Sequence, residues 1–284
     1  MITVPHVALP AMGAFRSKYP QKGTAMWQLI IEALVKVGLP IGAAIGVVYS
    51  CRRFNFPRSF EGKSGDVEGI YVTVLATIYA VVLAFMVFVV WTRYDSADSN
   101  VDAEATVVTD ISRLARALPE PSSSHLRDDC RDYVTSVVTI EWPAMAQRKG
   151  DRRMRAAINT LWEDVFALQK VGGVDSVVRD HLYERMLRLN DLRRARQLAS
   201  RTTLPSLLWA LLYFGGLLVV FFASIFTVEQ LGHHLLKAVA LTALISLTLF
   251  VVSTLDHPFQ GYFGISPSAF RMHAPSQEAM MHRQ

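Results

Sequence analysis

Charged side chains are scarce in this chain. They make up 19% of its 284 residues, whereas 51% of the residues are hydrophobic and the mean hydropathy is +0.27. Typical soluble domains carry about 25% charged residues. A disordered chain has the opposite composition, with few apolar residues and much charge. The composition therefore excludes a disordered protein and argues against an ordinary soluble enzyme.

Cysteine is almost absent, and the excess of positive charge is small. Two cysteines in 284 residues exclude a disulfide scaffold. The 29 Lys and Arg residues give a net charge of only +5 against the 24 Asp and Glu residues. Nucleic-acid readers concentrate a much stronger basic excess on one face. We therefore expect no nucleic-acid partner.

Familiar catalytic motifs are missing as well. The sequence contains no glycine-rich phosphate loop, no HExxH zinc motif and no G-x-S-x-G nucleophile turn. Cys51 and Cys130 lie far apart, and neither belongs to a metal-ligand spacing. We therefore expect neither an enzyme nor a cofactor-binding protein.

The charges that are present gather in the middle of the chain. The segment from Arg93 to Arg201 holds 18 basic and 17 acidic residues in 109 positions, which is 35 of the 53 charges. The other 175 residues hold only 18 charges. The sequence is therefore polar in its centre and apolar on both sides.

Three uncharged runs are long enough to cross a membrane. Gly69–Trp91 has 23 residues, Leu204–Val228 has 25 and Ala238–Leu255 has 18. A helix rises 1.5 Å per residue, so about 20 residues cross a hydrocarbon core of about 30 Å. We predict a membrane-spanning helix in each run.

A first span is predicted over Trp27–Cys51, although its uncharged part covers only 15 residues from Val37. Glu32 and Lys36 precede that part at a spacing of four, so they can pair on one helix face. The alternative is a cleaved signal peptide, with Arg16 and the lysines after it as its basic region.

Four spans would place both termini and the central segment on one side of the membrane. Basic residues near span ends favour the cytoplasmic side. Nine lie on the side of the central segment and five on the other: Arg16, Lys18, Lys22, Arg93, Arg193, Arg194, Arg196, Arg201 and Arg271, against Arg52, Arg53, Arg58, Lys63 and Lys237. The balance predicts an inner-membrane protein whose central segment and termini are cytoplasmic; without a first span, the N-terminus would change sides.

The sequence thus predicts an all-α, four-span membrane protein with a helical cytoplasmic bundle between spans 2 and 3. The expected parts are an N-terminal tail (1–26), a transmembrane hairpin (27–92), the bundle (93–203), a second hairpin (204–255) and a C-terminal tail (256–284).

Periodic apolar residues predict four helices in the bundle. The first, 95–118, continues from the second span without a break. The second should begin at Ser124 as its N-cap and be kinked or ended by Pro143. The third covers 156–170 and stops at Gly172-Gly173, and the fourth begins after Asp175 as its cap and leads back into the third span.

One face of the second span carries small, hydroxyl and aromatic residues. The candidates for a pore lining are Thr73, Thr77, Ala80, Ala84, Phe85 and Phe88. Small residues at helical spacing suit either a pore wall or close helix packing, and the sequence leaves both open. In a pore, Phe85 and Phe88 would form a hydrophobic constriction.

Three aspartates follow the second span at spacings of three and four. Asp95, Asp98 and Asp102 therefore share one helix face, and Asp256 after the fourth span could approach them. Hard cations such as Ca²⁺ need several oxygen ligands. A solvated acidic stripe is the simpler interpretation, so these residues are only weak calcium candidates and no metal site is expected.

A set of short motifs resembles one family when taken in order. They are Tyr79–Phe85 (YAVVLAF), Trp91–Asp95 (WTRYD), Glu104-Ala105, Leu118-Pro119, Glu141–Pro143 (EWP), Asp191–Arg194 (DLRR), Leu255–Gly261 (LDHPFQG) and Ser266-Pro267. Together they are similar to the bacterial bestrophin-like membrane proteins, and the resemblance covers roughly Val37 to Phe270.

The resemblance implies a relationship to bestrophins, which are oligomeric anion channels with a pore lined by the second span. It therefore implies a homo-oligomer in a lipid bilayer, with inorganic anions as the permeant partners. Bestrophins also carry a dense acidic calcium clasp after the last span, where this chain has only Asp256. A non-conducting scaffold or sensor that acts through the helical bundle is the alternative function.

Overall fold

The computed structural model describes residues 22–53, 64–147, 156–225 and 231–273. Every regular element in these ranges is helical. Arg16, Lys18, Arg58 and Lys63, which entered the charge balance, lie outside the described residues, as do residues 1–21 and 274–284 of the two terminal tails. The prediction of an all-α protein is confirmed for the part of the chain that the structure describes.

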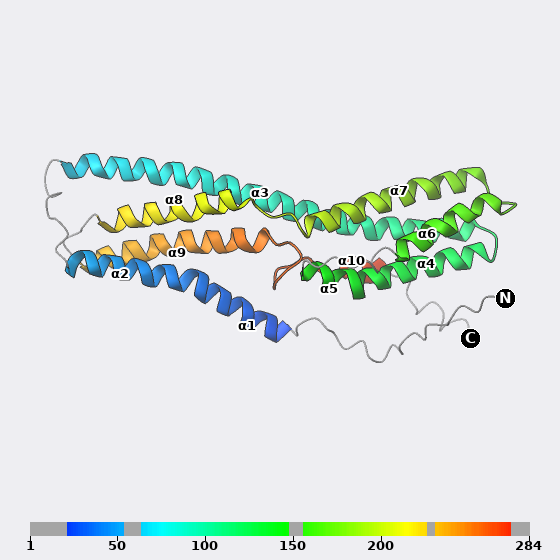
Figure 1. The fold of residues 1–284 in the computed structure, drawn as a ribbon, viewed down its shortest axis with the longest axis horizontal. Coiled ribbons are helices and arrows are strands. Elements are labelled where there is room, and N and C mark those ends of the chain that lie inside the picture. Colours follow the sequence, from blue (N-terminus) through cyan, green and yellow to red (C-terminus); the bar gives the residue numbers. More distant parts are fainter. Residues whose placement is uncertain (1–21, 54–63, 148–155, 226–230, 274–284) are drawn as a thin grey trace.

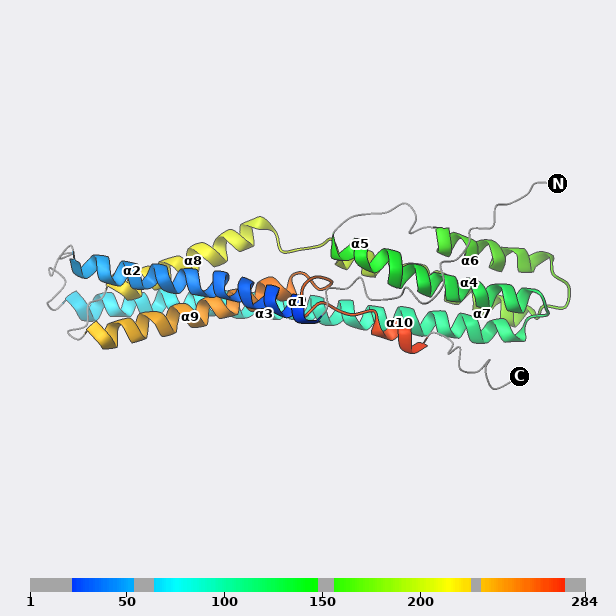
Figure 2. The same cartoon turned by 90° about the horizontal axis from the view of Figure 1, so that it is seen from below.

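The molecule is long and consists of two helical halves placed end to end (Figures 1 and 2). One half contains α1 (Lys22–Ala33), α2 (Leu39–Arg53), α8 (Ser206–Ile225), α9 (Leu231–Leu255) and the first part of α3 (Ser64–Leu114). The other half packs around the second part of α3 and contains α4 (Ser122–Ser136), α5 (Trp142–Ala146), α6 (Ala156–Ala167), α7 (Ser176–Ala199) and α10 (Ser268–His273).

Helix α3 joins the two halves without interruption. It has 51 residues, and at 1.5 Å per residue it is about 77 Å long. Its uncharged part, Gly69–Trp91, belongs to the apolar half, and its charged continuation forms part of the bundle. The sequence prediction that the second span leaves the membrane as one long helix agrees with this arrangement.

Four helical stretches are long and apolar enough to cross a membrane: Ile30–Ser50, Gly69–Ala117, Ser206–Ser224 and Gly232–Leu255. Between 6% and 33% of the most apolar window in each is buried within the protomer. A soluble protein would hide such side chains from water. These helices therefore expose their apolar residues to lipid or to another protein surface.

The predicted first span contains a local change of helical winding. A π-helical turn, η2 (Leu34–Gly38), separates α1 from α2 and ends two residues before Pro40. Proline has no N–H to donate to the carbonyl of Lys36, so the regular hydrogen-bond ladder cannot continue there. The predicted pair does form, with Nζ of Lys36 3.7 Å from a carboxylate oxygen of Glu32.

The second bundle helix begins earlier than predicted, and of the two outcomes expected at Pro143 the structure excludes an end of the helix there. Its first residue is Ser122, and the N–H of Ser124 is instead capped by the Glu120 side chain at 3.1 Å. Pro143 does not end the helical path: the π-helical turn η5 (Val137–Glu141) precedes it, and α5 continues to Ala146. A π turn thus accommodates this proline as it does Pro40.

The remaining bundle boundaries agree with the prediction. Helix α6 and the short turn η7 (Leu168–Lys170) together cover 156–170. Gly173 then has a φ of +83°, a conformation that glycine adopts at little cost. A side-chain oxygen of Asp175 accepts the N–H of Val177 at 2.9 Å, which caps α7 as expected.

Helices α3 and α8 approach closely at two glycines in the apolar half. The buried Tyr79 of α3 donates its hydroxyl to the carbonyl of Leu212 at 3.0 Å. A Cβ atom on Gly215 would lie 2.7 Å from Cδ2 of Tyr79, and one on Gly216 would lie 2.9 Å from its hydroxyl oxygen. The ring of Tyr79 therefore fits against α8 only because neither glycine has a side chain.

This contact predicts an effect of adding one methyl group. Gly215→Ala should destabilise the detergent-solubilised protein by about 1–3 kcal/mol, because the rigid Tyr79 ring must move. Gly46→Ala in α2, where a Cβ would meet nothing within 4 Å, is the matched control and should not destabilise. Thermal unfolding followed by circular dichroism measures both, and equal midpoints for the two variants would contradict the packing described.

Candidate functional site

The six predicted pore-lining residues share the outer face of α3. Thr73, Thr77, Ala80 and Ala84 are exposed in the protomer, and Phe85 and Phe88 are 62% and 63% exposed. The opposite face of the helix packs inward, through Tyr79 and Val90. The protomer therefore leaves the whole candidate face uncovered, which is compatible with a pore wall, a contact between copies or lipid.

The two threonines of this face add little polarity to it. The hydroxyl of Thr73 donates to the carbonyl of Gly69 at 2.8 Å, and that of Thr77 donates to the carbonyl of Thr73 at 2.7 Å. Bonds of this kind satisfy the hydroxyl within its own helix. The face is thus uncharged and mainly apolar from Gly69 to Trp91.

The four aspartates that the sequence offered as weak calcium candidates do not form a metal site in the described part of the chain. Asp95, Asp98 and Asp102 are exposed along α3. Asp256 is only 4% exposed, and its two oxygens accept the backbone N–H of Leu204 at 2.8 Å and the indole N–H of Trp209 at 3.4 Å. No group of three His, Cys, Asp or Glu residues suited to a metal occurs in the described ranges. Asp256 instead ties the end of α9 to the start of α8, and the expectation that it could complete a cation site is wrong.

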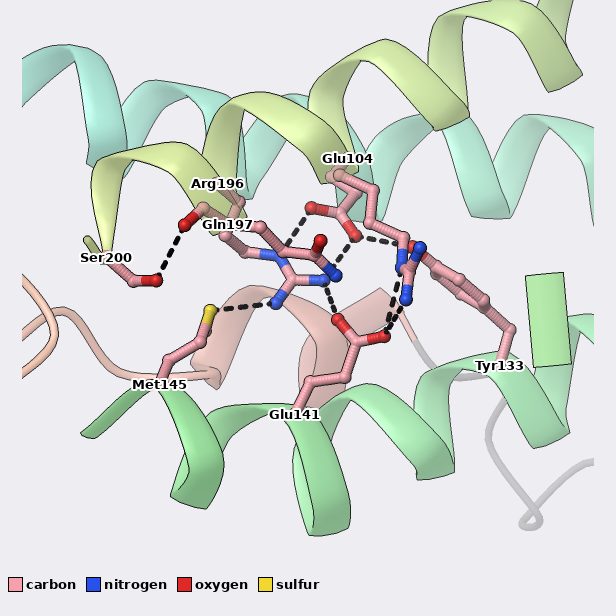
Figure 3. A network of polar contacts seen from close by, with 8 residues as sticks. Glu104, Tyr133, Glu141, Met145, Arg196, Gln197 and Ser200 are labelled. Carbon is pink, nitrogen blue, oxygen red and sulfur yellow. Dashed lines mark hydrogen bonds and ion pairs between the residues drawn. The ribbon is translucent and has the colours of Figure 1, made fainter. Parts of the chain in front are cut away.

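The bundle contains a buried network of ionised side chains that the sequence analysis did not identify (Figure 3). Arg196 of α7 and Glu104 of α3 are both 0% exposed. Their contact is bidentate: Nε of Arg196 lies 2.7 Å from Oε2 of Glu104, and Nη2 lies 3.0 Å from Oε1. The same Nη2 donates to Oε2 of Glu141 in η5 at 2.6 Å.

Arg193, one turn earlier in α7, completes the charge balance. Its Nε and Nη2 donate to Oε1 of Glu141 at 2.9 Å and 2.7 Å. Two glutamates therefore face two arginines, so the buried network has no net charge. Tyr133 of α4 adds a neutral donor, with its hydroxyl 2.6 Å from Oε1 of Glu104.

Aromatic rings and a sulfur atom close the network on its other side. The guanidinium of Arg196 lies 5.5 Å from the ring centroid of Trp142 and 5.9 Å from that of Phe270, within the range of cation–π attraction. Its Nη1 lies 3.3 Å from Sδ of Met145. Trp142 also donates its indole N–H to the carbonyl of Ile265 at 3.2 Å, which fixes the segment before α10.

Burial and charge act in opposite directions on these groups. Burial alone would lower the pKa of Arg196, but Glu104 and Glu141 more than offset it, so the pKa is raised and the guanidinium stays charged. Burial and the carboxylate of Glu104 raise the pKa of Tyr133 well above its usual value, so its hydroxyl remains a donor. Arg196 and Tyr133 therefore both keep their protons over the physiological pH range.

Sequence signals for this network existed. Glu104, Glu141, Trp142 and Arg193 all belong to the motifs that carried the family resemblance. Arg193 and Arg196 also continue the buried stripe of α7. Arg193 lies seven residues after the buried Met186, and Arg196 lies seven residues after the buried Leu189. An arginine in an apolar register signals a buried partner, because an unpaired buried charge is too costly.

Removing one member of the network should be strongly destabilising. Arg196→Met should lower the free energy of unfolding by about 3–5 kcal/mol, because it leaves two buried glutamates without their shared partner. Arg188→Met, an exposed arginine of the same helix, should change it by no more than about 0.5 kcal/mol. Denaturant unfolding of both purified variants tests this, and similar midpoints would show that the network contributes little to stability.

One family model matches the chain, and solved structures share its fold. The model of the bestrophin-like domain matches residues 38–270, close to the extent of the sequence resemblance. No curated protein matches the chain. Three solved structures illustrate the similarity of fold. Two single-residue variants of a bacterial bestrophin homologue from Klebsiella pneumoniae give TM-scores of 0.68 and 0.67, with 11% and 12% identity.

The alignments with these two structures cover 89% and 90% of this chain and 100% and 98% of theirs. A variant of a membrane protein gives a TM-score of 0.66 at 12% identity, with 85% of this chain and 95% of that one covered. At such identities the structures establish the fold alone.

The family match spans most of the chain, from α2 to the buried Phe270, and with the four apolar helices it indicates a membrane protein. The chain belongs to the bestrophin-like family.

Proposed function

We propose that the protein is a homo-oligomeric ion channel that conducts inorganic anions. The observation that carries the proposal is the outer face of α3, an exposed, uncharged face of small, hydroxyl and aromatic residues on an apolar helix of a bestrophin-like chain. Anions are named because the family resemblance implies them.

Helix α3 is the best candidate to surround the channel axis. It is the longest of the apolar helices, and its outer face combines Ala80 and Ala84 with two threonines. The exposed side of α8 lacks such a row of small residues and carries Leu207, Tyr213, Phe214, Leu217 and Phe221. Small side chains leave room for ions near an axis, whereas large apolar ones suit contact with lipid.

Phe85 and Phe88 would form the narrowest part of such a pore. They lie close to the end of the apolar run, one turn or two before Trp91, where α3 enters the bundle. Rings of exposed phenylalanines around an axis would exclude water from a narrow passage, which is a known way to gate a channel. The acidic face at Asp95, Asp98 and Asp102 would then follow the constriction on the bundle side.

The orientation is part of the proposal. The positively charged residues near span ends favour an inner-membrane protein with the bundle and both termini in the cytoplasm. The anions would therefore leave the constriction into a vestibule surrounded by the bundles of neighbouring copies.

Recording across a planar bilayer tests the proposal directly. The purified protein should give discrete currents whose reversal potential follows the chloride gradient. Absence of currents in common salts, across voltage and calcium concentration and from protein shown to be inserted, would contradict it.

Side-chain truncation tests the assignment of the constriction. Phe85→Ala and Phe88→Ala should each raise single-channel conductance, because a smaller side chain widens and wets the narrow part. Phe214→Ala in α8 is the matched control, since Phe214 is 61% exposed and should face away from the pore. Unchanged currents in the two α3 variants, or loss of the oligomer, would show that these rings serve packing.

A non-conducting scaffold or sensor remains a second candidate because the apolar half has few buried charges. Among the described residues of this half, one ion pair occurs, between Glu32 and Lys36. Nζ of Lys36 also donates a hydrogen bond to Oγ of Ser253, near the end of α9, at 3.1 Å. Ionisable groups inside a membrane often mark transport pathways. The scaffold predicts that the inserted oligomer stays silent, so the bilayer recording separates the two functions.

A further inference from the structure

A crevice lies where the apolar half of the molecule meets the bundle, between α3, the end of α7 and the segment that follows α9 (Figure 1). Its volume is about 340 Å³, which is within the range of sites for small molecules. Three of the residues that line it are alanines, Ala97 of α3 and Ala195 and Ala199 of α7, and their small side chains leave this space open.

The crevice lies at the level where the apolar helices end. Arg93, one of its lining residues, comes two residues after Trp91, the last residue of the uncharged run of α3. Leu255 is the last residue of α9, and Thr202 precedes the first residue of α8 by four positions. In a bilayer this level is the boundary between the hydrocarbon core and the lipid headgroups, where exposed tryptophans such as Trp91 are enriched.

Three hydrogen-bond donors of α3 line the crevice on one side of the helix. They are the side chains of Arg93, Ser96 and Asn100, which lie within about 60° of one another around the helix axis. Within the part of the chain that the structure describes, none of the three has a hydrogen-bond or ion-pair partner. The hydroxyls of Thr92 and Thr202, by contrast, each donate to a backbone carbonyl at 3.0 Å. The crevice therefore offers one positive charge and two neutral donors to a ligand.

The nearby carboxylates are directed elsewhere. Asp95 follows Arg93 by two residues, which is a rotation of about 200°, so it lies on the opposite side of α3. Asp256 does line the crevice, but its oxygens already accept the N–H of Leu204 and the indole N–H of Trp209. Arg93 is therefore the ionised group of the lining whose hydrogen-bonding capacity is unused.

We propose that this crevice binds the phosphate group of a membrane phospholipid. The planar guanidinium of Arg93 would hold two phosphate oxygens, and Ser96 and Asn100 would donate to the others. A lipid phosphodiester carries one negative charge, which one arginine balances. The start of the acyl chains would lie against Leu198, a lining residue that is 66% exposed, and Leu255. The site does not depend on conduction, and a free phosphate would use the same donors.

Thermal unfolding of the delipidated full chain, followed by circular dichroism in detergent micelles of increasing lipid content, tests the site. Dioleoyl-phosphatidylglycerol should raise the unfolding midpoint, because a ligand that binds the folded state stabilises it. Dioleoylglycerol, which has the same acyl chains without the phosphate, should give a much smaller shift. Inorganic phosphate at the same concentration should also give a much smaller shift, because it lacks the contacts of the acyl chains.

Three substitutions locate the effect. Arg93→Met should raise the lipid mole fraction needed for half of the shift by about tenfold to a hundredfold, as expected for loss of a charge-assisted contact. Arg201→Met, the matched control, removes an exposed charge at the same level outside the lining and should leave that mole fraction unchanged. Ala199→Leu fills the crevice without removing a charge and should weaken lipid binding as well, so it provides the test if Arg93→Met does not fold.

Four outcomes would count against the site. Absence of a shift, equal shifts with the phospholipid and dioleoylglycerol, or equal effects of Arg93→Met and Arg201→Met would overturn the proposal. A shift with inorganic phosphate as large as that with the phospholipid would support the phosphate contact but overturn a lipid as its source.

Discussion

The pairing of two glutamates with two arginines inside the bundle determines how the rest of the molecule is oriented. Glu104 is in the same continuous helix as the exposed phenylalanines, 16 residues after Phe88. At about 100° per residue this is a rotation of about 160°. Glu104 therefore points into the bundle while Phe88 points outward. Together with Tyr79 at the α8 crossing, the network prevents α3 from turning about its axis.

A buried network of this kind contributes more to the choice of one packing arrangement of the helices than to the free energy of unfolding. Removing two ion pairs from water costs much of what their attraction returns, so apolar replacements can be equally stable. The geometry is nevertheless demanding, because Arg196 must reach Glu104, Glu141 and the Trp142 ring at once. These contacts tie the position of α7 to those of α3 and η5. Rigid docking of the bundle on α3 would allow changes in the bundle to act on the apolar half through one helix.

The sequence was informative where a pattern has one physical meaning. Uncharged runs of 18 residues or more in the second, third and fourth spans required membrane-length helices, and Asp175 after two glycines marked the start of α7. Positions at which the same residues are compatible with two local structures were less predictable. Pro143 could have ended its helix but was accommodated by a π turn, and the cap of α4 came from Glu120 instead of Ser124.

The partners of charged side chains were the least predictable feature. Asp256 follows the fourth span like an acidic ligand, yet backbone and indole donors more than 45 residues away use both of its oxygens. Glu104 and Arg196 are 92 residues apart, so no local spacing connects them. The outer face of α3 was identified from spacing alone, but whether it meets water, lipid or another copy depends on chains that a single protomer does not contain.

The most direct test of the account is a cryo-electron microscopy map of the detergent-solubilised particle. Our proposal predicts a closed symmetric oligomer with an axial passage, lined by the α3 face from Thr73 to Phe88 and narrowest at Phe85 and Phe88. The buried Glu104–Arg196 network should lie within each protomer. A monomer, an oligomer without an axial passage, or one in which α3 faces the surrounding detergent would contradict it.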